Sequence, residues 1–239
     1  MTKRDSKTLP EWLYLETEDL PEPSALPKPL WLENTKIEQA MDSLNTHPEI
    51  SAVLKRLWQK DPYTYNHCHR VADLAQWIGQ FLSLSNQERV EIYLVGLMHD
   101  VGKIFTPDHV LKKPGPLTRE EFEIMKKHPE DSANIISNFK DLGYLEPAIR
   151  AHHERFDGKG YPDGLLRDKI HIFSRVIFVA DTFDAMTTSR VYRKKLDLEV
   201  TYQELTDCSG SQFDPEVSKA FVTAHQKLRE WIHNKKKAA

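Results

Sequence analysis

Cysteine is scarce in this sequence of 239 residues: it occurs only as Cys68 and Cys208, which lie far apart and form no CxxC pair. Two isolated thiols do not make the disulfide framework of a small secreted domain, and they suit a reducing compartment. They also argue against a zinc site built from thiolates, because such sites gather several cysteines at short spacings.

Long apolar runs and an excess of positive charge are also lacking. No stretch reaches the roughly 20 apolar residues of a membrane-spanning helix, and the first residues, MTKRDSKTLPEW, lack the apolar centre of a signal peptide. The formal net charge of −3 gives the whole molecule no attraction for a nucleic acid polymer. We therefore expect a cytoplasmic protein without a membrane span, in which any anionic ligand meets local positive charge.

The chain divides by composition into one main domain with two short ends. Residues 1–33 are polar and rich in proline, which predicts an extended tail or linker. A short helical segment is expected at 34–60, the main domain at 61–233, and a disordered tail at 234–239.

Helical periodicity runs through the main domain, and no alternation of strands and helices or internal repeat interrupts it. The segment 63–82 carries one apolar stripe at helical spacing. The run 173–187 fits a buried strand or a buried helix, but Asp181 and Asp184 lie about one helical turn apart, which favours a helix with a polar face toward a site. These patterns predict an all-α fold.

Two local signals predict where helices begin and end. Thr118 followed by Glu121 fits a capping box at a helix start. Gly102, after the apolar run at 87–100, suits a helix terminator because glycine adopts left-handed backbone angles readily.

The stretch HHERFDGKGYP at 152–162 combines two histidines with a glycine-rich loop. The imidazoles of His152 and His153 suit borderline metals such as iron, zinc and nickel. Gly158 and Gly160 allow unusual backbone angles and close approach of a ligand to the main chain. The stretch therefore predicts a metal-binding pair joined to a loop shaped for a ligand.

Five histidines and two aspartates lie on or beside apolar helical faces. Each one alone suits a core residue bonded to a neighbour, but seven N and O ligands exceed what one tetrahedral ion requires. They suit two ions bridged by a carboxylate, and Asp100, beside His99, is the expected bridge. Ions about 3.5–4 Å apart are a common device for phosphoester hydrolysis, because they acidify a bridging water and neutralise charge on phosphate. The candidate ligands are His67, His99, Asp100, His128, His152, His153 and Asp181.

Three cations near these candidates could add phosphate contacts. Lys103 lies one turn beyond His99, and Arg190 and Arg193 follow Asp181. Arginine offers phosphate a bidentate fork.

In the order of these motifs the sequence resembles the HD superfamily of metal-dependent phosphohydrolases, and most closely its HD-GYP subfamily. The resemblance spans roughly residues 60–225. It implies an HD-domain helical bundle with the C-terminal helical extension of HD-GYP proteins. It also implies hydrolysis of cyclic di-GMP, a bacterial second messenger, with two or three metal ions. The motifs that carry it are His67, HDVGK at 99–103, His128, HHERFDGKGYP at 152–162, DTFDAMTTSRVYR at 181–193 and GSQFDP at 210–215.

Carried over by position, the resemblance implies a role for each candidate. The seven histidines and aspartates would be metal ligands, with Asp100 and Lys103 taking part in catalysis. Asp157 is expected to fix the loop, and Asp184 to orient a ligand or an arginine. The residues expected to contact substrate are Lys103, Gly160, Tyr161, Pro162, Arg190 and Arg193.

Two positions depart from the family pattern. Members with a third metal carry a glutamate four residues before the first histidine, where this chain has Tyr63. We therefore expect two divalent ions, iron or manganese with nickel and zinc as alternatives, and pGpG as product in preference to GMP. Val191 replaces the proline usual before the family's tyrosine, which loosens the loop that carries Arg190 without removing a chemical group.

The leading hypothesis is a cyclic di-GMP phosphodiesterase in which a metal-bridging hydroxide attacks phosphorus at a bimetal centre. The expected partners are cyclic di-GMP or a related cyclic dinucleotide and proteins of second-messenger signalling. One alternative is a cyclic dinucleotide sensor or protein-interaction module that does not hydrolyse. Another is a phosphodiesterase for a different cyclic dinucleotide, such as cyclic GMP-AMP.

Overall fold

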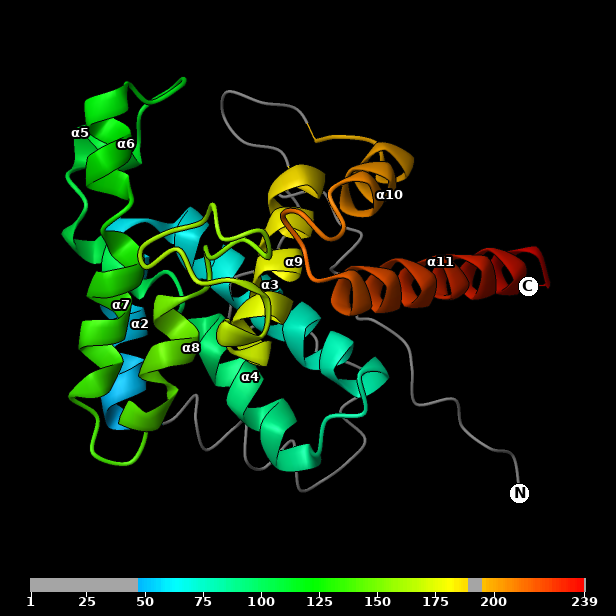
Figure 1. The fold of residues 1–239 in the computed structure, drawn as a ribbon, viewed down its shortest axis with the longest axis horizontal. Coiled ribbons are helices and arrows are strands. Elements are labelled where there is room, and N and C mark those ends of the chain that lie inside the picture. Colours follow the sequence, from blue (N-terminus) through cyan, green and yellow to red (C-terminus); the bar gives the residue numbers. More distant parts are fainter. Residues whose placement is uncertain (1–46, 189–194, 239) are drawn as a thin grey trace.

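The computed structural model of this protein describes residues 47–188 and 195–238, and every regular element within these ranges is a helix (Figure 1). Extended backbone pairs there only as isolated bridges, Asp157 with Leu166 and Ser209 with Phe213. The all-α prediction is therefore confirmed. In chain order the α-helices are α2 (Pro48–Lys60), α3 (Pro62–Phe81), α4 (Asn86–Met98), α5 (Asp108–Leu111), α6 (Arg119–Met125), α7 (His128–Ser137), α8 (Glu146–Arg150), α9 (Ile172–Thr187), α10 (Leu198–Asp207) and α11 (Pro215–Ala238). The short 3₁₀-helices are η4 (Val101–Phe105), η5 (Gly143–Leu145) and η6 (Arg167–Lys169).

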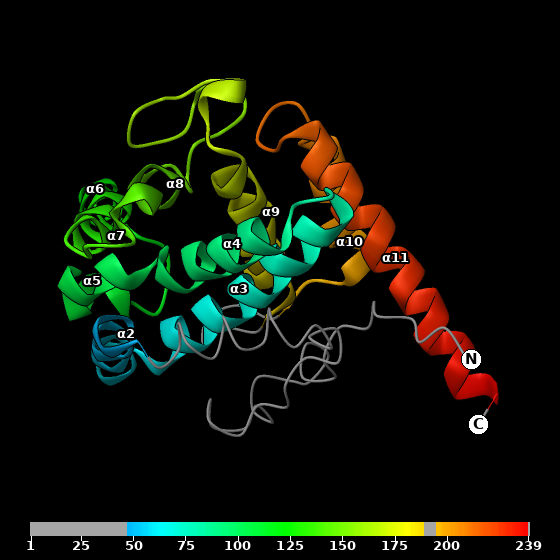
Figure 2. The same cartoon turned by 90° about the horizontal axis from the view of Figure 1, so that it is seen from below.

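Helix α3 forms the centre of the bundle, with α2, α4, α9 and α11 packed around it (Figures 1 and 2). Its predicted apolar stripe is fully buried at Val71, Leu74 and Ile78. Burial of each such side chain contributes about 1.5–3 kcal/mol. The helix starts sharply because the carboxylate of Asp61 accepts hydrogen bonds from the backbone N–H groups of the first turn.

Capping boxes begin two of the helices. Thr118 and Glu121 form the predicted one at the start of α6. Ser85 and Glu88 form another at the start of α4. In each box the first residue's hydroxyl accepts from the N3 backbone N–H while the glutamate accepts from the first residue's N–H.

Gly102 does not terminate α4, which ends at Met98; instead, Gly102 lies within η4. A Cβ at this position would lie 2.3 Å from the carbonyl oxygen of His128 and 2.6 Å from the amide nitrogen of Ser132. The Gly102 N–H also donates to Ser132 Oγ at 2.8 Å. Glycine is needed because η4 packs directly on α7, and this packing brings the end of α4 to His128.

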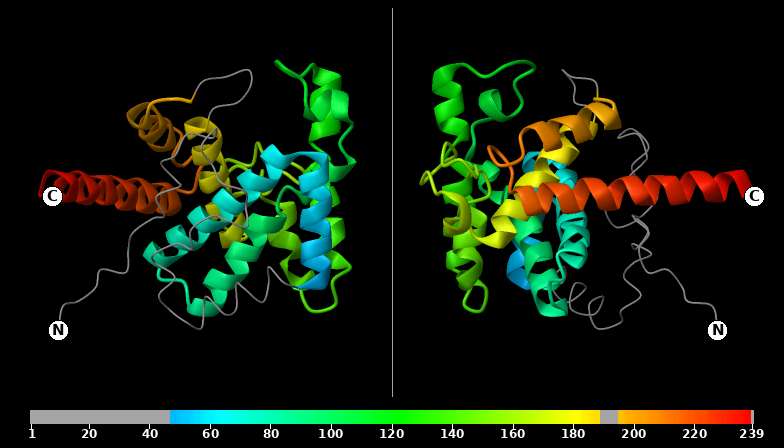
Figure 3. Two further views of the ribbon diagram at one scale, coloured as in Figure 1. Left: turned by 180° about the vertical axis from the view of Figure 1, so that it is seen from behind. Right: turned by 45° about the vertical axis from the view of Figure 1, so that its right-hand side comes forward.

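Two parts of the described structure stand away from the bundle. The α5–α6 arm, residues 108–125, projects beside the first turns of α7, and α11 extends past the other helices (Figures 1 and 3). The backbone of α11 continues to Ala238, where the sequence predicted a disordered tail. The predicted tail at 1–33 lies outside the described residues, and the proposed domain limits stay predictions. No helix in the described ranges combines the length and apolar character needed to cross a membrane.

Candidate metal centre

The structure brings all seven candidate ligands together, and Asp100 lies between two groups of them. Its Oδ2 is 3.6 Å from Nε2 of His67 and 3.4 Å from Nε2 of His99. Its Oδ1 is 3.1 Å from Nε2 of His128 and 3.9 Å from Nε2 of His152. One carboxylate thus presents each of its oxygens to a different set of imidazoles.

The first group combines His67 of α3, His99 at the end of α4 and Asp181 of α9. Their ligand atoms lie within 4.8 Å of one another, and Nε2 of His67 is 3.1 Å from Oδ1 of Asp181. The consecutive helices α3 and α4 therefore meet the distant α9 at this point. Each helix supplies one ligand from its inward face.

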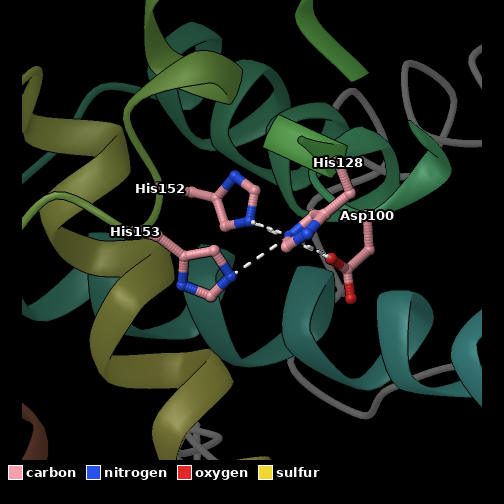
Figure 4. A group of neighbouring side chains, drawn as sticks. All are labelled: Asp100, His128, His152 and His153. Carbon is pink, nitrogen blue, oxygen red and sulfur yellow. Dashed lines mark hydrogen bonds and ion pairs between the residues drawn. The ribbon is translucent and has the colours of Figure 1, made fainter. Parts of the chain in front are cut away.

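The second group joins Asp100 to His128, His152 and His153 (Figure 4). Nε2 of His128 lies 3.2 Å from Nε2 of His152 and 3.2 Å from Nε2 of His153. His128 begins α7, and the other two histidines lie in the turn after α8. The three rings point toward one another in the view of Figure 4.

Three of the histidines are oriented by the main chain of the helix that each one follows. Each Nδ1 lies 2.7 Å from the carbonyl oxygen three residues earlier. A carbonyl oxygen can only accept, so Nδ1 carries the hydrogen and Nε2 keeps its lone pair. These carbonyls belong to last helical turns, where intrahelical donors run out. The pairs are His99 with Gly96, His128 with Met125, and His152 with Ile149.

His67 is oriented differently, by a buried ion pair. Its Nδ1 donates to Oδ2 of Asp184 at 2.7 Å. Arg70 also donates to the same carboxylate, through Nε at 2.6 Å and Nη2 at 2.9 Å. The sequence predicted that Asp184 would orient a ligand or an arginine, and its carboxylate contacts one of each. Arg70 itself was missed, although it follows His67 by three residues and so shares its face of α3.

The imidazoles of the second group are held neutral. Burial, reinforced for His152 by the neighbouring histidines, lowers the pKa of His152 well below its usual value. Burial likewise lowers the pKa of His153 to about 3 and that of His128 from its usual value. Neutral imidazole is the form that binds metals.

The carboxylates are held in their charged form. Burial alone would raise the pKa of Asp100, but Lys103 and His99 keep it well below its usual range. Burial alone would raise the pKa of Asp181 as well. Its hydrogen bond with His67 outweighs this effect and lowers the pKa of Asp181. For His67, burial lowers the pKa, but bonds to Asp181 and Asp184 outweigh it and raise the value to about 9. A metal ion at Nε2 would therefore displace a proton from His67.

The donor atoms fit divalent metal ions. Nε2 of His99 is fully buried, and no hydrogen-bond partner for it is found within residues 47–188 and 195–238, a costly state for a polar atom unless a cation binds it. His128 and His152 both carry their hydrogen on Nδ1, so their Nε2 lone pairs face each other at 3.2 Å. Facing lone pairs repel unless a cation lies between them. Two nitrogens bound at right angles to one ion at about 2.1 Å lie about 3 Å apart.

Lys103 adds positive charge at the edge of the cluster. Its Nζ lies 2.5 Å from Oδ2 of Asp100, and part of its side chain is open to solvent. Burial alone would lower the pKa of Lys103, but the Asp100 carboxylate raises it, so the ammonium stays charged. Arg190 and Arg193, expected to supply further cations, lie outside the described residues, as does Val191.

The loop at 152–162 is fixed by its own carboxylates. Glu154 is buried and accepts hydrogen bonds from the backbone N–H groups of Asp163, Gly164 and Leu165 at 2.6–3.0 Å. Asp157 pairs with Arg155 and accepts from the N–H of Lys159, which agrees with its expected role in fixing the loop. The contribution of Glu154 was missed, although its place directly after two candidate ligands was a signal.

The two glycines of this loop are needed for different reasons. Gly158 has a φ of +76°, which disfavours other residues. Gly160 lies against the protein's own main chain: a Cβ there would come within 2.3 Å of the Arg155 amide nitrogen. The sequence predicted that a ligand would approach the main chain closely here, but at Gly160 it is the protein's own backbone that makes this close approach. It sets Tyr161, joined to Pro162 by a cis peptide bond, so that its ring stacks on His153 with centroids 4.9 Å apart.

Tyr63 stands beside the first ligand group. Its ring is nearly parallel to that of His67, with centroids 6.5 Å apart. The guanidinium of Arg70 lies 6.0 Å from the Tyr63 ring centroid. A phenol ring rather than a carboxylate thus faces this side of His67.

Residues 32–217 match the family model of the HD domain. The chain belongs to the HD-domain family. This HD domain is 35% identical over 189 residues to a cyclic di-GMP phosphodiesterase of Pseudomonas aeruginosa, covering 79% of this chain and 45% of that protein. It is 37% identical to a cyclic di-GMP phosphodiesterase of Thermotoga maritima, covering 79% and 52% respectively. These relatives confirm the predicted membership of the HD-GYP subfamily.

Other relatives carry a different substrate in their names. A 3′3′-cGAMP-specific phosphodiesterase of Vibrio cholerae is 35% identical over 70% of this chain and 39% of that protein. This HD domain spans about half the length of the first curated relatives it matches.

Solved structures share the fold. A cyclic GMP-AMP phosphodiesterase of Vibrio cholerae aligns with a TM-score of 0.56 at 18% identity, covering 80% of this chain and 49% of that one. An HD-GYP-type protein of Bdellovibrio bacteriovorus aligns with a TM-score of 0.58 at 16% identity, covering 82% and 71%. The HD-domain helical bundle predicted from the sequence is thereby confirmed.

Proposed function

We propose that this HD domain is a metal-dependent phosphodiesterase that hydrolyses cyclic di-GMP to linear pGpG. The observation that carries the proposal is Asp100, whose two oxygens face two separate groups of imidazoles, the first of which also includes the Asp181 carboxylate. Two relatives at 35% and 37% identity carry this activity in their names. The shared fold and the unpaired Nε2 of His99 support the same conclusion.

Each group of residues would have its own role in the reaction. Two divalent ions, when bound, supply an acidified water and neutralise charge on the phosphate oxygens. Asp100 would serve both groups of ligands. The ammonium of Lys103, at the edge of the cluster, would stabilise charge that develops on a phosphate oxygen. Asp184 and Arg70 keep His67 in place. The ligands are His67, His99, Asp100, His128, His152, His153 and Asp181.

Iron or manganese is proposed for the two ions, and nickel and zinc also suit N and O donors. Tyr63 supplies no carboxylate beside His67, which supports two ions rather than three and pGpG rather than GMP as the product. Arg190 and Arg193 remain proposed phosphate or guanine contacts. Gly160, Tyr161 and Pro162 remain proposed walls of the nucleotide site.

Cyclic GMP-AMP is the alternative substrate, favoured by the names of the Vibrio cholerae relatives. The described part of the site shows no group that reads guanine against adenine. The second alternative is a module that binds the nucleotide without hydrolysis. In that case the metal-loaded protein would bind the cyclic dinucleotide but release no product.

The proposal includes a cytoplasmic location, supported by two cysteines that are both free thiols. It also includes protein partners in second-messenger signalling. A nucleic acid polymer is not among the expected ligands, because the net charge is −3.

The test is turnover by the full chain loaded anaerobically with iron, manganese or nickel, with metal content measured on the same samples. Chromatography should show cyclic di-GMP converted to pGpG, and parallel kinetics on cyclic GMP-AMP should rank the two substrates. Bound nucleotide without product would favour the sensor. Protein holding two metals per chain but inert toward both cyclic dinucleotides would refute the enzymatic proposal.

A further inference from the structure

A line of aromatic rings leads from the metal centre toward solvent. The first ring is His153, a candidate ligand, and Tyr161 stacks on it with an interplanar angle of 29°. Phe122, from the α5–α6 arm, meets Tyr161 edge to face, with centroids 6.2 Å apart. The arm and the loop after α8 are thus joined beside the centre by aromatic contact.

The outer end of this line is open. The Phe122 side chain is 45% exposed, although it comes from a short helix that could bury it against its own arm. One face of Tyr161 is covered by His153, and the ammonium of Lys126 lies over the Phe122 ring, so a base that stacks on Phe122 must use the other face or displace this ammonium. Single exposed apolar rings are common on protein surfaces, and Phe122 is distinguished by its contact with Tyr161 beside the ligand cluster.

Positive charge accompanies the exposed ring. Nζ of Lys126 lies 5.5 Å from the Phe122 ring centroid and pairs with Oε1 of Glu123 at 2.7 Å. Lys103 lies at the metal centre itself. An aromatic surface with ammonium groups at both ends suits a ligand that joins planar rings to phosphate, because bases stack on aromatic side chains while the backbone meets the cations.

We propose that Phe122 is a base-stacking residue, which binds one purine of a cyclic dinucleotide whose phosphate lies at the metal centre. This inference rests on the proposed function for the position of the phosphate. Stacking on a ring is tolerant of base identity, because every base has a π-face. Phe122 therefore contributes affinity for guanine and adenine alike and does not set the choice between them.

The test compares Phe122→Leu with Phe122→Tyr and Phe122→Trp in the full chain. Leucine keeps an apolar contact with Tyr161 but has no π-face, whereas tyrosine and tryptophan keep one. Phe122→Leu should raise KM about 10- to 100-fold for cyclic di-GMP and for cyclic GMP-AMP by a similar factor. Tyrosine and tryptophan should restore KM, and metal content should match the parent in all three.

A cyclic dinucleotide with 2-aminopurine in place of one base gives a second readout, because stacking quenches its fluorescence. Quenching should occur with the parent protein and be lost with Phe122→Leu. Tyr144→Leu is the matched control: Tyr144 is 59% exposed and lies beyond the other end of α7 from Phe122. It should leave KM and quenching unchanged.

The outcomes separate the two proposals. If the parent hydrolyses cyclic di-GMP and Phe122→Leu retains its KM and quenching, stacking on Phe122 is refuted while the phosphodiesterase stands. If the parent is inert but its quenching is lost in Phe122→Leu, the base site stands and hydrolysis is refuted. Loss of metal from Phe122→Leu would show that the ring acts by supporting His153, and would overturn the stacking role.

Discussion

Substitution of Asp184 by asparagine tests how the first ligand group is held. The carboxylate is buried and accepts hydrogen bonds from His67 Nδ1 and from two nitrogens of Arg70. Asparagine keeps the size but removes the charge, and one end of its amide is a donor. Its single oxygen can take the place of Oδ2, which accepts from His67 Nδ1 and Arg70 Nη2, but its NH2 group then faces Arg70 Nε, and the guanidinium is left buried without its counter-charge.

Two effects of different magnitude should follow. Breaking a buried ion pair by removing one partner costs about 3–5 kcal/mol. For a chain of this size each kcal/mol lowers Tm by about 2–4 °C, so the metal-free protein should melt about 6–20 °C lower. Loss of the charged acceptor that orients His67 should also weaken metal binding about 10- to 100-fold.

Thermal unfolding after chelation measures the first effect, and metal titration below the unfolding transition measures the second. Asp214→Asn is the matched control, because Oδ2 of Asp214 pairs with Nη1 of Arg175 at 2.5 Å and this aspartate is also buried. It should lose stability yet keep metal affinity. If Asp184→Asn binds metals as tightly as the parent, Asp184 does not orient His67, and an unchanged Tm would refute the buried-pair argument.

Four further substitutions probe the rest of the centre. Asp100→Ala and His153→Ala should each lose bound metal together with activity; full metal content and rate in either variant would contradict the ligand assignment. Lys103→Ala should keep its metal but lower kcat by at least about 10-fold, since charge stabilisation at phosphate is lost; a kcat equal to the parent's would exclude Lys103 from the chemistry. Gly160→Ala forces a Cβ to within 2.3 Å of the Arg155 amide nitrogen, so the loop must shift; metal analysis and KM should show weaker substrate binding, and parent-like kinetics would show that the loop's position is not critical.

Patterns spread along a helix predicted the fold well. The stripe at Val71, Leu74 and Ile78 is fully buried in α3. The spacing of Asp181 and Asp184 correctly favoured a helix for α9. Both signals depend on the 3.6-residue repeat, which the sequence displays directly.

Contacts between segments were harder to predict. Gly102 was assigned to a helix end, because the sequence does not show that η4 packs on α7 at a distance that excludes a Cβ. Arg70 was missed, since its partner Asp184 is 114 residues away. Nothing in the sequence singles out Phe122, because its contact with Tyr161 exists only once the arm and the loop are folded together.

The group that orients each histidine decides whether a substitution can change that part of the metal centre. The hydrogen-bond acceptors of His99, His128 and His152 are carbonyl oxygens, and a carbonyl persists whatever side chain its residue carries. The acceptor of His67 is the Asp184 side chain, which a single codon change can remove or replace. Selection can therefore adjust the position of the His67 imidazole through Asp184 and Arg70, while His99, His128 and His152 keep their tautomers.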